Sequence, residues 1–192
     1  MKPRLGVLAS GRGSNFQSIQ TEIVSGALDA EVVVLISDRE RAPALEIAEN
    51  FGIESRYIPY DKSNRQDFEE KAAAMIEAHD CDLIILAGFM RIITPWFIDR
   101  FAGRILNIHP SLLPSFKGLH PQKQALDAGV KIAGCTVHVV TAEMDSGPII
   151  AQRSVVVFDD DTEESLSDRI LVQEHLLYPE AIRIYSEKRS AR

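Results

Sequence analysis

The residues with the clearest potential for chemistry are Asn107 and His109, two positions apart at the end of an apolar run. The run from Ile105 to Ile108 has the length of a buried strand, and Pro110 ends it because proline cannot donate to a sheet. Side chains alternate faces along a strand, so Asn107 and His109 are expected to point the same way. An amide donor beside an imidazole suits proton transfer next to a developing oxyanion. Taken singly, a histidine at a strand end is more often structural than catalytic.

Three further polar residues are candidates for the same site. Asp145 lies in a turn with Gly147 and is either an acidic partner for the histidine or an ordinary turn residue. His120, in the loop after the pair, either positions a substrate or is solvated. Gln173 falls on the apolar stripe of the last long helix, three residues after Ile170. A polar group there needs a hydrogen-bonding partner, which is either a ligand or the protein's own backbone.

A glycine turn near the N-terminus is a candidate anion site. It reads Ser10-Gly11-Arg12-Gly13-Ser14-Asn15 and joins an expected strand to an expected helix, where backbone N–H groups bind phosphate. Phe16 occupies the third glycine position of the dinucleotide fingerprint, and no Gly-Lys-Ser/Thr follows. The turn therefore favours a phosphate over NAD or a P-loop nucleotide. The alternative is a tight turn in which Ser14 or Asn15 caps the helix.

Apolar runs of strand length alternate with amphipathic stretches of helix length. Strands are expected at residues 5–9, 32–36, 53–58, 83–87, 105–108, 132–140 and 149–158. Helices are expected at residues 16–24, 44–51, 67–79, 95–101, 122–128 and 162–177. The first helix should bury Phe16, Ile19, Ile23 and Val24, and Pro179 should end or kink the last one, before a helical piece to about residue 187 and a frayed basic tail.

This alternation predicts an α/β fold with a doubly wound, mostly parallel sheet of Rossmann-like type and a late antiparallel strand pair. A turn at residues 143–147 should join that pair as a hairpin. At 192 residues the chain is expected to be a single domain, residues 1–192.

Composition narrows the class of protein. The net charge of -7 argues against a general nucleic-acid or membrane-surface binder. No signal-peptide core or membrane-length run is present, which indicates a soluble, cytoplasmic protein. Cys81 and Cys135 are far apart without metal-ligand spacing and are expected to be reduced, buried thiols.

Five stretches together resemble the folate-dependent formyltransferases, in particular the members that act on glycinamide ribonucleotide. They occur in the family's order and span essentially the whole chain. The stretches are the glycine turn, Leu86-Ala87-Gly88-Phe89-Met90-Arg91-Ile92, residues 106–114 with Gly118-Leu119-His120, Thr136-Val137-His138-Val139-Val140 with Asp145-Ser146-Gly147-Pro148, and Gln173-Glu174-His175 with Tyr178-Pro179.

The resemblance implies a role for each stretch. It makes Asn107, His109 and Asp145 the catalytic groups. The implied glycinamide ribonucleotide contacts are Gly11, Arg12, Gly13, Ser14, Asn15, Gln173 and Glu174. The implied folate contacts are Arg65, Met90, Arg91, Ile92, Ile93, Asn107, Thr141, Ala142, Glu143, Met144 and Asp145. Where family members often continue Ala-His-Arg, this chain has Pro121-Gln122-Lys123, so His120 alone carries over as a positioning loop histidine.

The implied reaction is direct transfer of the formyl group of 10-formyltetrahydrofolate to the amine of glycinamide ribonucleotide, in purine biosynthesis. Asn107 and protonated His109 would stabilise the oxyanion with help from Asp145, and no metal is needed. The expected partners are these small molecules, with no nucleic acid and no membrane, for a monomer or homodimer. A tRNA formyltransferase should carry a further C-terminal domain and a formyltetrahydrofolate hydrolase an N-terminal one. A non-catalytic nucleotide-binding domain and a dehydrogenase are the remaining alternatives.

Overall fold

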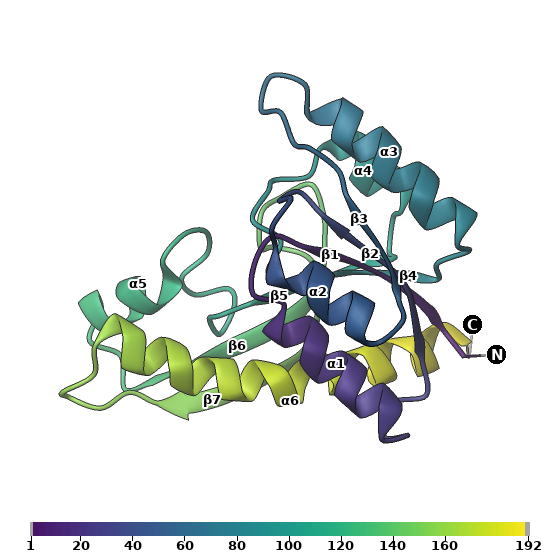
Figure 1. The fold of residues 1–192 in the computed structure, drawn as a ribbon. Helices are drawn as coiled ribbons and strands as arrows, with labels where there is room; N and C mark the ends of the chain where they lie inside the picture. Colours follow the sequence, from purple (N-terminus) through teal and green to yellow (C-terminus); the bar gives the residue numbers. More distant parts are fainter. Residues whose placement is uncertain (1, 191–192) are drawn as a thin grey trace. The chain divides into compact units, whose positions relative to one another are not determined.

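The computed structural model describes residues 2–190 and is shown as a ribbon in Figure 1. Its contacts divide the chain into two compact units, Met1–Leu106 and Asn107–Arg192.

The first unit is a parallel sheet of four strands with helices between them. The strands are β1 (Arg4–Ala9), β2 (Glu31–Ser37), β3 (Glu54–Tyr57) and β4 (Leu83–Leu86), in the order β3-β2-β1-β4. The helices are α1 (Ser14–Val24), α2 (Pro43–Asn50), α3 (Arg65–Ala78) and α4 (Pro95–Arg100). Every residue of β4 is buried, as in a strand covered on both faces.

The strand order creates a switch point beside β1. The crossovers through α1 and α2 move the chain from β1 to β2 to β3, and the crossover through α3 returns it to the other side of β1. Right-handed crossovers then place α3 on the opposite face from α1 and α2. Figure 1 shows α1 beside α2, with which it is in contact, and α3 beside α4, to which Glu77 of α3 is joined by Arg100. Loops at the carboxyl ends of β1 and β4 therefore border the crevice where open α/β sheets bind ligands.

The second unit is built on an antiparallel hairpin and one long helix. Strand β5 (Ile105–His109) begins in the first unit and brings Asn107 and His109 into the second. Strands β6 (Ile132–Val139) and β7 (Ile149–Val156) pair antiparallel, which confirms the predicted hairpin. The helices are α5 (Pro121–Asp127) and α6 (Glu163–Ser190). In Figure 1, α6 runs along β6 and β7, with which it is in contact.

Three predicted details are wrong. Helix α6 is continuous through Pro179, so no separate helical piece follows that proline. The neighbouring side chains of Tyr178, Ala181 and Ile182 are fully buried, and this packing offsets the cost of about 3 kcal/mol that an interior proline imposes. The last described turn of α6 is helical, although a frayed tail was predicted, and residues 191–192 lie outside the described part of the chain. Val24 is 69% exposed because it lies about 100° around α1 from Ile23, away from the buried stripe of Phe16 and Ile19.

Within residues 2–190, no helix has both the length and the apolar composition to cross a bilayer. Among the same residues, no group of three His, Cys, Asp or Glu side chains is arranged to hold a metal ion. Cys81 and Cys135 are free and buried, as predicted.

Candidate active site

Asn107, His109 and Asp145 meet in the second unit. The end of β5 supplies Asn107 and His109, and the loop between β6 and β7 supplies Asp145. Nδ1 of His109 lies 3.5 Å from Oδ2 of Asp145, and the two side chains are only 7% and 11% exposed. An imidazole and a carboxylate that are this close and this well buried from solvent interact far more strongly than an exposed pair. The turn left Asp145 as either an acidic partner or an ordinary turn residue, and the structure brings it to His109.

Both ring nitrogens of His109 face oxygen acceptors. Nε2 lies 2.9 Å from the backbone carbonyl oxygen of Phe116, and Nδ1 faces the Asp145 carboxylate. A neutral imidazole has one N–H, whereas an imidazolium has two. A neutral ring can donate to only one of these acceptors, whereas a protonated ring can donate to the Phe116 carbonyl and pair with the Asp145 carboxylate.

The loop that carries Asp145 has little freedom. Asp145 adopts a left-handed backbone conformation with φ of 49°, and its Oδ2 accepts a hydrogen bond of 2.9 Å from the backbone N–H of Gly118. Gly147 follows at a point where an added Cβ would lie 1.8 Å from the carbonyl oxygen of Val139. Only glycine permits this crossing, so local geometry fixes where the carboxylate sits.

His138 on β6 is a member of the cluster that the sequence reasoning did not assign. Its Nδ1 lies 3.1 Å from the Val139 carbonyl oxygen and its Nε2 lies 3.3 Å from the Asn107 Nδ2. Burial lowers the pKa of His138 from its ordinary 6.5, so the ring is neutral at pH 7. Nδ1 then donates to the carbonyl, and Nε2 accepts from the Asn107 amide and orients it.

A signal for His138 was present in the sequence. Thr136 and His138 are alternate polar residues on a strand that is otherwise apolar, and both are at least 98% buried. Two polar side chains on one face of a buried strand must find hydrogen-bonding partners. Thr136 and His138 have the same two-residue spacing as Asn107 and His109, which places both members of each pair on one face of their strand.

The glycine turn lies in the first unit at the carboxyl end of β1. Helix α1 begins at Ser14, its N-cap is Gly13 with φ of 76°, and no side chain caps it, so the alternative of a cap by Ser14 or Asn15 does not hold. A Cβ on Gly13 would lie 2.9 Å from the Cα of Ala44 on α2, whereas one on Gly11 would meet nothing. Gly13 is thus required by helix packing, and Gly11 leaves the turn open.

The turn and the segment after β4 are hydrogen-bonded to each other. The backbone N–H of Ser10 donates to the Gly88 carbonyl at 3.2 Å, and the Ser10 hydroxyl accepts from the Met90 N–H at 2.8 Å. Two stretches that the sequence assigned to different ligands therefore share the carboxyl edge of this sheet.

Among the residues predicted to contact folate, Arg91 has specific partners. Its Nε donates to Oδ2 of the fully buried Asp38 at 2.6 Å, and its guanidinium lies 4.6 Å from the centre of the Tyr60 ring. Met90 and Ile92 beside it are 70% and 60% exposed. Two exposed apolar side chains next to a held guanidinium make a surface suited to a flat, partly anionic molecule. The other predicted contacts of this unit are the half-buried Ile93, the exposed Arg65 at the start of α3, and the exposed Arg12.

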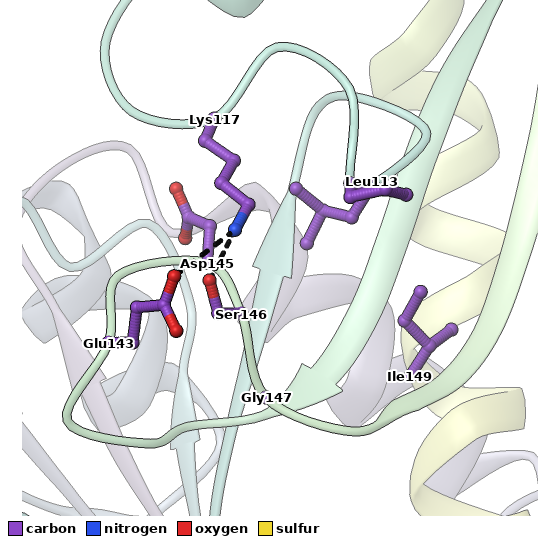
Figure 2. A pocket seen from close by; sticks show the side chains of 8 residues that line it. Leu113, Lys117, Glu143, Asp145, Ser146, Gly147 and Ile149 are labelled. Carbon is purple, nitrogen blue, oxygen red and sulfur yellow. Dashed lines mark hydrogen bonds and ion pairs between the residues drawn. The ribbon is translucent and has the colours of Figure 1, made fainter.

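The second unit holds the rest of the predicted contacts. Thr141, Ala142, Glu143 and Met144 lie in the loop that leads to Asp145. A cavity of about 200 Å³ lies between this loop and residues 113–117. Figure 2 shows Lys117 reaching toward Glu143 and Ser146, with Leu113 and Ile149 as the apolar side. Nζ of Lys117 hydrogen-bonds to Ser146 and lies 3.7 Å from Oε1 of Glu143.

The remaining predicted residues lie at the start of α5 and on α6. His120 is 73% exposed, and its Nδ1 lies 3.5 Å from Oε1 of Glu163 on α6. Gln173 and Glu174 lie on α6, half-buried and buried respectively. Among the described residues, His120 forms no hydrogen bond or ion pair with the three catalytic candidates.

Residues 3–182 match the family described as formyl transferase. The chain is 42% identical over 181 residues to the phosphoribosylglycinamide formyltransferase of Bacillus subtilis, covering 94% of this chain and 93% of that one. It spans 14% to 18% of the length of trifunctional purine biosynthetic proteins that it also matches.

Two solved structures share the fold. Glycinamide ribonucleotide transformylase 1 from Symbiobacterium toebii superposes with a TM-score of 0.93 at 47% identity, over 98% of this chain and 89% of that one. A formyltetrahydrofolate deformylase from Pseudomonas syringae superposes with the same score at 30% identity, over 98% of this chain and 63% of that one. These matches confirm the predicted doubly wound α/β fold class.

Proposed function

Because the chain belongs to the formyl transferase family, we propose that it transfers the formyl group of 10-formyltetrahydrofolate to the amine of glycinamide ribonucleotide, a step of purine biosynthesis. The 42% identity to the Bacillus subtilis enzyme, over 93% of that enzyme's length, supports this substrate pair. The observation that carries the chemistry is the buried contact between His109 and Asp145, with Asn107 on the same strand.

The first role is stabilisation of negative charge. The substrate amine attacks the formyl carbon, a C–N bond forms, and the carbonyl electrons move onto oxygen. An amide nitrogen carries two hydrogens. One Asn107 hydrogen is directed to Nε2 of His138, and the second is then available to the oxyanion. Preorganised donors of this kind contribute about 10²–10³ in rate.

The second role belongs to His109. Its Nε2–H donates to the Phe116 carbonyl, an acceptor that an oxyanion with full negative charge can replace. Asp145 compensates the positive charge of the ring and assists movement of the amine proton toward N10 of the folate. Collapse of the tetrahedral intermediate then breaks the bond between the formyl carbon and N10, and the formyl group stays on the former amine.

We also propose which residues bind each part of the two substrates. We assign the substrate phosphate to the open glycine turn at residues 11–15, and the rest of the ribonucleotide to Gln173 and Glu174. We assign the folate to Arg65, to residues 90–93 and to residues 141–145, and a positioning role to His120. Support for the first folate segment comes from the exposed Met90 and Ile92 beside Arg91. The match over residues 3–182 supports one formyltransferase domain, which we propose acts in the cytoplasm.

A second candidate is hydrolysis of the formyl donor, which the likeness to the Pseudomonas syringae deformylase favours. The same three side chains would then act on a water molecule instead of an amine. The two reactions differ in whether glycinamide ribonucleotide is needed.

The test is an absorbance assay that follows conversion of 10-formyltetrahydrofolate with and without glycinamide ribonucleotide. Transfer predicts conversion only when both are present, with one formylated ribonucleotide formed per folate consumed. Equal rates without the ribonucleotide would establish the hydrolase instead. Folate binding without any conversion would establish a non-catalytic protein.

A further inference from the structure

The backbone of Leu113 is held by two side chains from the hairpin β6–β7. Its N–H donates to the hydroxyl oxygen of Thr136 on β6 at 3.0 Å, and its carbonyl accepts from Nε2 of Gln152 on β7 at 3.0 Å. Nε2 of Gln152 also donates to the same Thr136 hydroxyl at 2.9 Å. The Thr136 hydroxyl in turn donates to the Ser111 carbonyl at 2.7 Å. We call this arrangement the Leu113 clamp.

Hydrogen bonds of Ser111 connect the clamp to His109. From Ser111, the backbone N–H donates to the His109 carbonyl at 2.9 Å and the hydroxyl donates to the Ser115 carbonyl at 2.6 Å. Phe116 follows in a left-handed conformation with φ of 55°, and its carbonyl accepts from Nε2 of His109. The hydrogen bond between His109 and Phe116 therefore joins the two ends of this segment, and the clamp holds Leu113 between them.

Thr136 and Gln152 contribute differently. Thr136 is fully buried and saturated, because its oxygen accepts two hydrogen bonds and donates one. Gln152 lies on β7, across from Thr136 in the antiparallel register, and is the only clamp member from that strand among the described residues. One of its two hydrogen bonds ties β7 to the Leu113 carbonyl, and the other ties it to the Thr136 hydroxyl on β6. Nothing in the proposed reaction requires Gln152 to touch a substrate.

We propose that Gln152 is a positioning residue that acts through Leu113 and Thr136 to hold the Phe116 carbonyl against Nε2 of His109. This inference rests on the proposed function for its effect on turnover, but not for its effect on the histidine ring. Loss of the Gln152 donor lets the 113–116 segment shift, and the His109 ring is no longer held in the orientation from which its Nε2–H passes from the Phe116 carbonyl to the oxyanion. Turnover then falls, while binding of both substrates is retained.

The test uses Gln152→Met, which keeps the length of the side chain and removes its donors. Transfer kinetics should show kcat reduced about tenfold, because the two part-buried hydrogen bonds of Gln152 are lost, with both KM values within about threefold. The pH at which kcat is half-maximal should also move. Thr136→Ser should keep near wild-type kcat because it retains the hydroxyl, and Thr136→Val should behave as Gln152→Met does.

Ser154→Ala is the matched control, since Ser154 lies two residues along β7 on the same face as Gln152. It should leave kcat and the pH profile unchanged. The second readout is the ¹⁵N spectrum of the His109 imidazole, identified by its loss in His109→Asn. Gln152→Met should change this spectrum in the absence of substrate, and Ser154→Ala should not.

Wild-type kcat and an unaltered imidazole spectrum in Gln152→Met would overturn the proposal. A reduced kcat with unchanged pH profile and spectrum would overturn it as well, because that pattern indicates structural support alone. If the wild-type protein transfers no formyl group, the proposed function fails, and the imidazole spectra still decide the role of Gln152.

Discussion

The strongest consequence of the site geometry concerns Asn107→Ala. The Asn107 amide directs one hydrogen to Nε2 of the neutral His138 at 3.3 Å and has a second for the oxyanion. Alanine removes both. Loss of the oxyanion donor should lower kcat by about 10²–10³, equivalent to about 3–4 kcal/mol of transition-state stabilisation. Loss of the bond to His138 should lower the free energy of unfolding by only about 1 kcal/mol.

Steady-state kinetics and urea unfolding separate these two effects. The control is His138→Gln, which keeps an acceptor for the Asn107 amide and should cost less than about tenfold in kcat. The oxyanion role predicts that kcat of Asn107→Ala falls far more than either KM rises. The reasoning is refuted if the loss appears in KM alone, or if kcat stays within tenfold of wild type.

Three other predictions address stability and reactivity. Gly13→Ala should lower the free energy of unfolding by about 1–3 kcal/mol in urea titrations, because of the positive φ and the close approach of α2, whereas Gly11→Ala should change it by less than about 0.5 kcal/mol. The lowered pKa of His138 predicts that stability falls as pH drops from about 6.5 through its folded-state pKa, since the unfolded chain binds the proton first. Unfolding at pH 5 to 7.5 should show a weaker pH dependence in His138→Gln, and an identical slope would contradict the assignment. Burial raises the pKa of Cys81 to about 11 and that of Cys135 to about 12, so a disulfide reagent at pH 8 should modify neither until urea unfolds the protein.

Local periodicity predicted most of the elements, because each depends on residues close in sequence. The same-face placement of Asn107 and His109 followed from a two-residue spacing, and the β6–β7 hairpin followed from two apolar runs around a glycine turn. The continuity of α6 did not follow, because a proline's cost is local while the packing that offsets it is tertiary.

The partners within the site were harder to predict for a related reason. The sequence suggested Asp145 as a partner of His109, but the second acceptor is the backbone carbonyl of Phe116. A backbone group carries no residue-type signal, so only the path of the loop reveals it. Gln152 could not be singled out either, because its partner is also a backbone group, the carbonyl of Leu113, on a segment far away in the sequence.

The most direct test of the central claim follows the formyl carbon itself. The protein is incubated with ¹³C-formyl-labelled 10-formyltetrahydrofolate and glycinamide ribonucleotide, and the products are observed by ¹³C NMR. The account predicts that the label appears in the formylated ribonucleotide, and that His109→Asn and Asp145→Asn slow its appearance. Label released as formate at the same rate with and without the ribonucleotide would contradict it.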